Sequence, residues 1–162
     1  MLSDFSKLAF AKPTRDGLIE SAQVELKAGW LRFGLALIMS LALIEAAGVW
    51  VALCWVAVAF AFEGASYFLV RMFVGAGGIW RRAYFVNSVL VCCVWTAYTI
   101  LIWFGGGEAA RLAAVAGLFA LSLYAVMVCH HDARLLTCLF LPPCATLITL
   151  LLHHAGQTNE SL

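Results

Sequence analysis

Two apolar segments, residues 109–129 and 135–152, are each long enough to cross a membrane and are separated by only a short polar loop. Apart from Arg111, their charged side chains are confined to that loop, which reads His-His-Asp-Ala-Arg. At a rise of about 1.5 Å per residue, each segment measures roughly 27 to 32 Å as a helix, and a bilayer core is about 30 Å thick. The two segments therefore predict a membrane hairpin.

The composition extends this interpretation to most of the chain. Hydrophobic residues make up 64% of the sequence and charged residues 12%, whereas soluble domains contain roughly 25% charged residues. The formal net charge of +1 and the lack of a concentrated basic face argue against a nucleic-acid partner. The lipid bilayer is the expected surrounding of this protein.

A continuous apolar run at residues 31–70 predicts two further spans. As one helix it would measure about 60 Å, twice the thickness of the bilayer core, so it must fold back on itself. We place the break at residues 46–48, where Glu45 and Gly48 supply polarity and backbone freedom, and Trp50 follows as an interfacial aromatic. The fold class is therefore all-α, a polytopic membrane helix bundle of about five spans at residues 31–47, 49–70, 84–103, 109–129 and 135–152.

The segments outside these spans complete the domain organisation. Residues 1–29 form a polar leader with an amphipathic pattern, either an interfacial or partner-docking anchor or an ordered cytoplasmic leader. The bundle occupies residues 30–154, and residues 155–162 form a polar tail. Within the bundle, the glycines and arginines of residues 71–83 predict a connecting loop, and Gly105 to Gly107 predict a tight turn.

Basic residues predict the orientation, because cytoplasmic segments of membrane proteins are enriched in Lys and Arg. With the N-terminus in the cytoplasm, nine of the ten basic residues are inside and Arg111 alone is outside. We therefore expect a multi-pass protein of a bacterial inner membrane with a cytoplasmic N-terminus and an external C-terminus. The inside set is Lys7, Lys12, Arg15, Lys27, Arg32, Arg71, Arg81, Arg82 and Arg134.

The order of features over the last spans points to a family. An aromatic-ended span leads into the turn at residues 104–107, Ala-Arg-Leu opens a small-residue-rich span, and Cys-His-His marks the inner loop before a span containing Pro142 and Pro143. Over about residues 31–152, this pattern resembles the N-terminal membrane input region of alphaproteobacterial hybrid sensor histidine kinases. The resemblance implies six spans that feed cytoplasmic kinase domains, so this chain looks like such a region cut before its sixth span, or like a stand-alone relative.

The resemblance implies a sensory or signal-input membrane module, for which a homodimer or an assembly with other membrane subunits is expected. The sequence has no phosphoacceptor box, no glycine-rich nucleotide loop and no catalytic constellation, so we expect no enzymatic activity and no cofactor. Two alternatives remain open, an accessory or scaffold subunit of a larger membrane complex and a small transporter.

Glu63 is the strongest candidate for a functional residue, because a charge inside a membrane is costly and usually faces a protein interior or a cavity. Ser66 and Tyr67 follow three and four residues later, so one helical face carries a carboxyl, a hydroxyl and a phenol. That face is able to bind a ligand or relay a proton. The alternative is a carboxyl held by hydrogen bonds purely for packing.

Histidines and cysteines give weaker indications. His130 and His131 in the inner loop are candidates for pH-sensitive groups, and the second histidine pair, His153 and His154, lies about 30 Å away along the fifth span, too far to share a haem. The six cysteines lack the Cys-x-x-Cys spacing of a metal site and are expected to be small core residues. No metal site is predicted.

Proline and small residues predict how the helices pack. Pro142 and Pro143 lack an N–H, so the fifth span is expected to be kinked near residues 138–142, and its freed carbonyls need a donor from Thr137 or from a neighbouring span. Small residues let helices approach closely in lipid. Two stripes, predicted to be packing surfaces or a dimer face, are Ala57, Ala61 and Ala65 and Ala109, Ala113 and Gly117.

Overall fold

The computed structural model describes residues 17–76, 78–130 and 132–159, and in these parts of the chain all regular structure is helical. Each of five helices contains a stretch long and apolar enough to cross a membrane. This confirms the predicted all-α membrane bundle with five spans. The helices are α2 (Gly17–Ala47), α3 (Val49–Ala76), α4 (Ile79–Gly105), α5 (Glu108–Cys129) and α6 (Ala133–Asn159).

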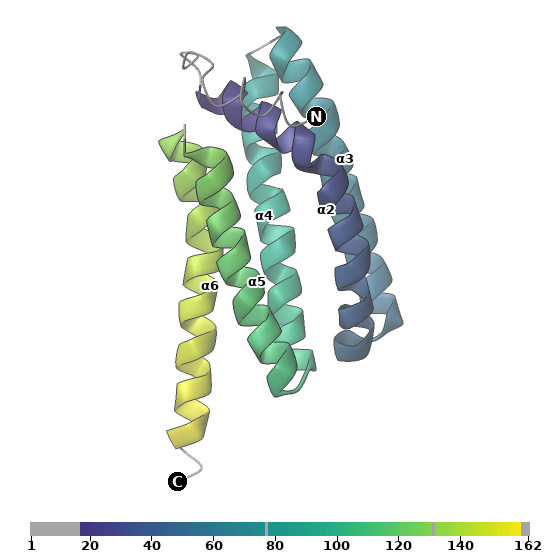
Figure 1. Cartoon of the computed structure of the whole chain (residues 1–162), viewed down its shortest axis with the longest axis vertical. Coiled ribbons are helices and arrows are strands. Elements are labelled where there is room, and N and C mark those ends of the chain that lie inside the picture. Colours follow the sequence, from purple (N-terminus) through teal and green to yellow (C-terminus); the bar gives the residue numbers. More distant parts are fainter. Residues whose placement is uncertain (1–16, 77, 131, 160–162) are drawn as a thin grey trace, which may run out of the picture.

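The spans run alternately up and down, with α4 in the middle of the bundle (Figure 1). Helix α4 contacts each of the other four described helices, whereas α2 pairs most extensively with α3, and α5 with α6. Because α4 is surrounded by protein, it carries more buried polar side chains than any other described helix, four of the eight, away from lipid. These are Asn87, Ser88, Thr96 and Thr99.

Two predicted turns are confirmed. Helix α2 ends at Ala47 and α3 begins at Val49, and Gly48 between them has a φ of 89°, a conformation that favours glycine because it has no Cβ. Helix α4 ends at Gly105, and α5 begins three residues later at Glu108. A chain confined to a membrane needs such short connections, because every unpaired backbone group in lipid is costly.

The predicted loop at residues 71–83 is wrong. Helix α3 continues to Ala76 and α4 begins at Ile79, so the connection is short and Arg71 and Arg81 both lie in helices. Gly78, with a φ of 59°, reverses the chain there. Glycine and arginine are loop signals in water, but at a membrane edge a longer helix keeps more backbone hydrogen bonds satisfied, and Arg71 places its guanidinium over the ring of Tyr67, 4.5 Å from the centroid.

Residues 17–28, called the leader segment here, form the first part of α2, before the part of that helix that is apolar enough to cross a membrane. Figure 1 shows the start of α2 lying across one end of the bundle before the helix turns along it. One face of this segment is buried, and its Leu18 and Ala22 belong to an apolar cluster that also includes Val70, Tyr84, Cys129 and Leu135 from the other four described helices. The buried face consists of Leu18, Ser21, Ala22 and Glu25.

Helix α6 continues through Pro142 and Pro143 without a break, so the expected kink does not interrupt it. The expected donor from a neighbouring span is present, but it is a thiol: Cys92 Sγ on α4 donates to the carbonyl of Leu139, 3.2 Å away. Thr137, the other expected donor, bonds to the carbonyl of Ala133 within its own helix. The carbonyl that Pro143 cannot reach is therefore satisfied by α4.

The small-residue stripes pack only in part within this chain. Gly117 on α5 lies close to α4, since an added Cβ would be 3.2 Å from Thr99 Cγ2. Ala57 and Ala61 on α3 and Ala109 and Ala113 on α5 are exposed on the outside of the bundle. Alanines of α2, α3 and α5 that do pack in the core lie on other faces of these helices, and they are Ala36, Ala52, Ala59 and Ala114. The sequence could not predict this, because residues at four-residue spacing share one face of a helix but do not identify the helix that packs against that face.

Candidate functional site

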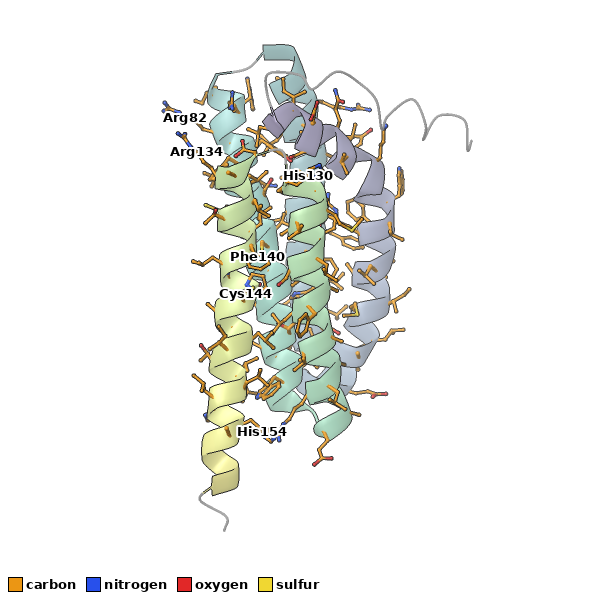
Figure 2. The ribbon with its side chains drawn as sticks, turned by 60° about the vertical axis from the view of Figure 1, so that its left-hand side comes forward. Arg82, His130, Arg134, Phe140, Cys144 and His154 are labelled. Carbon is orange, nitrogen blue, oxygen red and sulfur yellow. The ribbon has the colours of Figure 1, made fainter. Side chains whose placement is uncertain are left out.

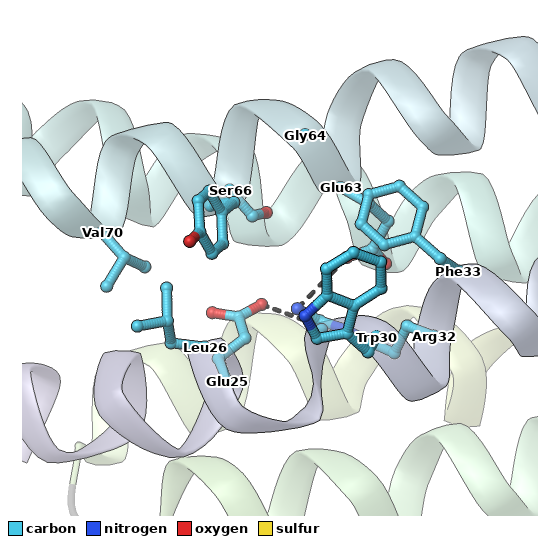
Figure 3. A pocket seen from close by; sticks show the side chains of 11 residues that line it. Glu25, Leu26, Trp30, Arg32, Phe33, Glu63, Gly64, Ser66 and Val70 are labelled. Atoms are coloured by element: carbon cyan, nitrogen blue, oxygen red, sulfur yellow. Dashed lines mark hydrogen bonds and ion pairs between the residues drawn. The ribbon is translucent and has the colours of Figure 1, made fainter.

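A buried ionic cluster lies between α2 and α3. Arg32 on α2 places Nη1 2.8 Å from Glu25 Oε1, one carboxyl on its own helix, and Nη2 3.1 Å from Glu63 Oε2 on α3. Glu25 and Arg32 are seven residues apart, which is two helical turns and hence the same face of α2. Figure 3 shows both side chains facing Glu63 across the space between the two helices.

Side chains of α4 and α5 form hydrogen bonds with the residues of this cluster. Tyr84 of α4 donates its hydroxyl hydrogen bond to Glu25 Oε2, and Trp95 of α4 donates from Nε1 to Glu63 Oε1 at 3.2 Å. Arg32 also donates from Nη1 to the hydroxyl of Tyr124 on α5, at 3.0 Å. We call these six residues, Glu25, Arg32, Glu63, Tyr84, Trp95 and Tyr124, the Arg32 network. It joins four helices.

A second polar contact lies one turn along α3. Asn87 of α4 donates from Nδ2 to Ser66 Oγ at 2.7 Å and to the carbonyl of Phe62 at 3.2 Å. Both Asn87 and Ser66 are buried. This contact clamps α3 to α4 next to Glu63, and such interhelical hydrogen bonds fix the relative register of helices in a membrane.

The charges of the Arg32 network do not balance. It contains one guanidinium and two carboxyl groups, and Glu63 is only 2% exposed. Burying a charge is costly unless it is paired, so with both carboxyls ionised the cluster holds one negative charge without a counterion. It reaches balance when it takes up one proton or one cation. The arrangement is therefore sensitive to a single positive charge.

Two cavities, each of about 300 Å³, are both lined by Arg32 and Glu25. The first lies between α2 and α3 and is called the α2–α3 groove; besides Glu25, Arg32 and Glu63, it is lined by Leu26, Gly29, Trp30, Phe33, Gly64, Ser66, Tyr67 and Val70. The second extends among α2, α4 and α5 between mostly apolar side chains, including Leu35, Val91 and Leu121. The Glu25–Arg32 pair thus borders both cavities.

The three candidates predicted on α3 all line the α2–α3 groove. Glu63 and Ser66 are both buried, each with a partner on α4. Tyr67 is half-exposed at 43%, and its hydroxyl accepts a hydrogen bond from Arg71 one turn further along α3. The predicted polar face therefore exists, but its residues bond to other helices and to Arg71 rather than to one another.

None of the described histidines belongs to the Arg32 network or lines the α2–α3 groove. His130 is exposed at the end of α5, with Nδ1 3.0 Å from the carbonyl of Met127, and His131 lies outside the described residues. His154 packs edge-on against Trp103 at the opposite end of the bundle, and Figure 2 shows His130 and His154 at opposite ends. In the described parts of the chain, no group of three or more His, Cys, Asp or Glu is arranged to hold a metal ion.

Sequence reasoning missed most of the Arg32 network. Arg32 was counted among the basic residues that determine orientation, yet its side chain is only 11% exposed. A signal was available, because Arg32 lies within the apolar span and an ionisable residue there is by default a functional candidate. Glu25 shares the face of Leu18 and Ala22 in the amphipathic pattern of the leader. For the aromatic members of the network, no pattern in the sequence separates them from ordinary apolar residues.

No family model, curated protein or solved structure matches this chain. The resemblance to kinase input regions therefore stays a prediction from the sequence. The defining feature of the site is the charge network that ties the leader segment to α3, α4 and α5.

Proposed function

We propose that this chain is a non-catalytic signal-input module of a bacterial inner membrane, in which the Arg32 network is the receiving element. The observation that carries the proposal is the pair of ionic contacts from Arg32 to Glu25 and Glu63. Charged groups inside a membrane are expensive and commonly serve function. The similarity of the sequence pattern to the input region of sensor kinases supports the same class of function.

The network provides a route from the receiving site to the end of the bundle. Neutralising Glu63 removes one of the two ionic partners of Arg32, so the guanidinium then pairs with Glu25 alone. Glu25 belongs to the leader segment, whose buried face covers that end of the bundle. A change of charge at Glu63 is therefore expected to change how the leader segment sits on α4. Such a segment, biased by a single charge, is what a switching element requires.

A glutamine at position 63 tests this route, since it mimics a neutral carboxyl while keeping an oxygen for Trp95. We expect Glu63→Gln to shift the distance distribution between spin labels at Gln23→Cys on the leader segment and Arg82→Cys on α4, both exposed positions. The measurement is pulsed electron spin resonance on protein in lipid nanodiscs, with the exposed Cys54 and Cys93 replaced by alanine.

The matched control is Glu45→Gln, since Glu45 is an exposed carboxyl near the opposite end of α2. Its distance distribution should coincide with that of the unsubstituted protein. Identical distributions for all three proteins would show that the network has a packing role only, and the signal-input proposal would fail.

We also propose that the end of the bundle carrying the leader segment faces the cytoplasm. Arg82 and Arg134 lie at that end with His130 (Figure 2), and basic residues favour the cytoplasmic side. Arg32 no longer contributes to this count because it is buried between helices, but the remaining basic residues of the predicted inside set keep the strong asymmetry.

Orientation is testable with single cysteines that a membrane-impermeant maleimide reaches from one side only. In intact cells we expect Gly107→Cys to be labelled and Arg82→Cys to be protected until the membrane is opened. Gly107 suits the purpose because a side chain there meets no other atom within 4 Å. Labelling of both positions from the same side would contradict the five-span topology, and the reverse pattern would invert the orientation.

A subunit role within a larger membrane complex is the second candidate, and the outward-facing stripe of Ala57, Ala61 and Ala65 on α3 favours it. Ala57 and Ala61 are exposed and Ala65 is half-buried, and small residues allow a partner helix to approach closely. We expect the partner to be a second copy of the chain or another membrane subunit. Leucine at Ala61 should then lower the mass of the complex purified in mild detergent, whereas leucine at Ala97 of α4, an exposed position outside both stripes, should not.

A further inference from the structure

The α2–α3 groove has the features of a binding site for an organic cation. It is a cavity of about 300 Å³ with the Arg32–Glu25 pair on one wall and Glu63 on the other (Figure 3). A volume of several hundred Å³ is in the range of small-molecule sites, which typically combine apolar walls with a few placed polar groups. The charge, the walls and the opening of the groove each bear on which ligand fits.

The charge of the groove favours a cation. Two carboxyls and one guanidinium line it, and the guanidinium is already shared between both carboxyls. Glu63 is buried, yet within the described residues its Oε2 accepts no hydrogen bond, and its only neighbour of opposite charge is Arg32. An additional N–H donor with a positive charge would satisfy this oxygen and balance the cluster. A further anion would instead compete with both carboxyls for Arg32.

The walls favour an organic cation over a metal ion. Trp30, Phe33 and Tyr67 line the groove together with Leu26 and Val70, and aromatic faces attract ammonium groups while apolar side chains accommodate a hydrocarbon body. A metal ion prefers several oxygen or nitrogen ligands, whereas Ser66 Oγ already accepts a hydrogen bond from Asn87. Trp30 is 85% exposed to the outside of the bundle, so its indole is available to a ligand.

The groove opens where two glycines leave room. A Cβ added at Gly29 or Gly64 meets no atom within 4 Å, and both residues line the groove. An elongated ligand is therefore able to pass between α2 and α3 at these positions and extend into the surrounding bilayer. A larger side chain at either glycine would therefore begin in open space and extend into the volume that a ligand would use.

We infer that the α2–α3 groove binds an amphiphile with a primary ammonium head and an apolar body. The ammonium donates to Glu63 and Glu25, and the apolar body lies along Trp30, Phe33 and Tyr67. This inference names the ligand class for the signal-input function proposed above and rests on that function for its biological meaning. Binding itself is a separate property, and it is measured separately.

The test uses dodecylamine as the probe, with dodecanol and dodecanoate as neutral and anionic molecules of the same chain length. The full chain is placed in nanodiscs of phosphatidylcholine and phosphatidylglycerol, and saturable binding of the labelled probe is measured by scintillation proximity. We expect saturable binding of dodecylamine only. Equal saturable binding of dodecanol, or no saturable binding of dodecylamine, would overturn the inference.

Two glycine variants make the test specific to the groove. Gly64→Leu should weaken binding of dodecylamine by roughly tenfold or more, because the leucine occupies the opening and excludes the charge-assisted contact. Gly34→Leu is the matched control: Gly34 also lies in a helix with open space around it but does not line the groove, so affinity should be unchanged. If Gly64→Leu binds as well as Gly34→Leu, the ligand is elsewhere and the inference fails.

A carboxyl variant tests the head group. Glu63→Gln should lower affinity for dodecylamine by a factor similar to that of Gly64→Leu, because one negative charge is lost. The thermal unfolding of each variant is recorded alongside, and if Glu63→Gln does not fold, the Gly64→Leu comparison decides. Unchanged affinity in a folded Glu63→Gln variant would exclude Glu63 as the partner of the ammonium and overturn the inference.

A final experiment tests whether the ammonium group belongs to a lipid head group or to a free amphiphile. Repeating the titration in nanodiscs that contain phosphatidylethanolamine should weaken binding of dodecylamine if the lipid head group occupies the groove, and should leave it unchanged if only a free amphiphile fits. Either result supports an ammonium site. The spin-label distances distinguish this inference from the proposed signal-input function. Binding of dodecylamine without movement of the leader segment in Glu63→Gln would refute only the signal-input function. Movement of the leader segment in Glu63→Gln without any binding of dodecylamine would refute only the ligand inference.

Discussion

Replacing Arg32 with methionine is expected to destabilise the bundle by about 3–5 kcal/mol, the cost of breaking a buried ion pair and leaving charge uncompensated. Methionine keeps the length and apolar stem of the side chain, but Glu25 and Glu63 would then face each other without a cation. The loss should be measured as a shift in the unfolding curve of the protein in mixed micelles, followed by circular dichroism.

Two controls make this result specific. Arg134→Met removes an exposed arginine of α6 and should change stability by no more than about 0.5 kcal/mol. Adding Glu25→Gln and Glu63→Gln to Arg32→Met removes both uncompensated carboxylates and should restore more than half of the lost stability. An Arg32→Met protein that unfolds together with the Arg134→Met control would show that the cluster is hydrated rather than buried.

Gly105→Ala is expected to destabilise the fold by about 1–3 kcal/mol, in the range of overpacked cores. Gly105 is the last residue of α4, and a Cβ there would overlap the backbone carbonyl of Ala46 near the end of α2. A backbone carbonyl is unable to rotate away as a side chain does, so the ends of the two helices must separate. The same unfolding assay detects the change.

The control lies two residues further in the same turn. A Cβ at Gly107 meets no atom within 4 Å, and its φ of −77° suits any residue, so Gly107→Ala should leave stability nearly unchanged. Equal stability of the two variants would mean that α2 and α4 do not approach as closely at this end as the structure places them.

The sequence was sufficient to predict the number of spans and two of the three turns that link α2 to α5. The physical reason is that the bilayer fixes the length of an apolar helix, so a run such as residues 31–70 has to fold once and Gly48 is where the backbone is able to turn. The connector between α3 and α4 was predicted incorrectly for a related reason. Glycine and arginine mark loops in water, whereas here α3 and α4 extend beyond the spans predicted at residues 49–70 and 84–103, and Gly78 lies directly before α4.

Glu63 was identified from the sequence because the cost of an ionisable group in lipid depends on its own position in an apolar run. The residues that pair with Glu63 were not identified from the sequence, because ion pairs and hydrogen bonds between helices depend on which helix faces meet. Glu25 and Arg32 reach Glu63 only after α2 packs against α3, and the aromatic members of the network reach the cluster only after α4 and α5 close behind it.

The sequence by itself determined that this protein is a bundle of membrane-spanning helices with a carboxyl buried in one of them. The length and hydrophobicity of a segment are local properties, and they decide whether that segment is able to span a bilayer. Only the tertiary structure decided that this carboxyl shares a guanidinium with the leader segment and borders a groove open between two glycines. Hydrophobic helices fit together in many rotations at similar cost in lipid, because apolar burial gives little preference there. Their register is chosen by side-chain packing and interhelical hydrogen bonds such as that of Asn87 to Ser66, which exist only between residues far apart in the chain.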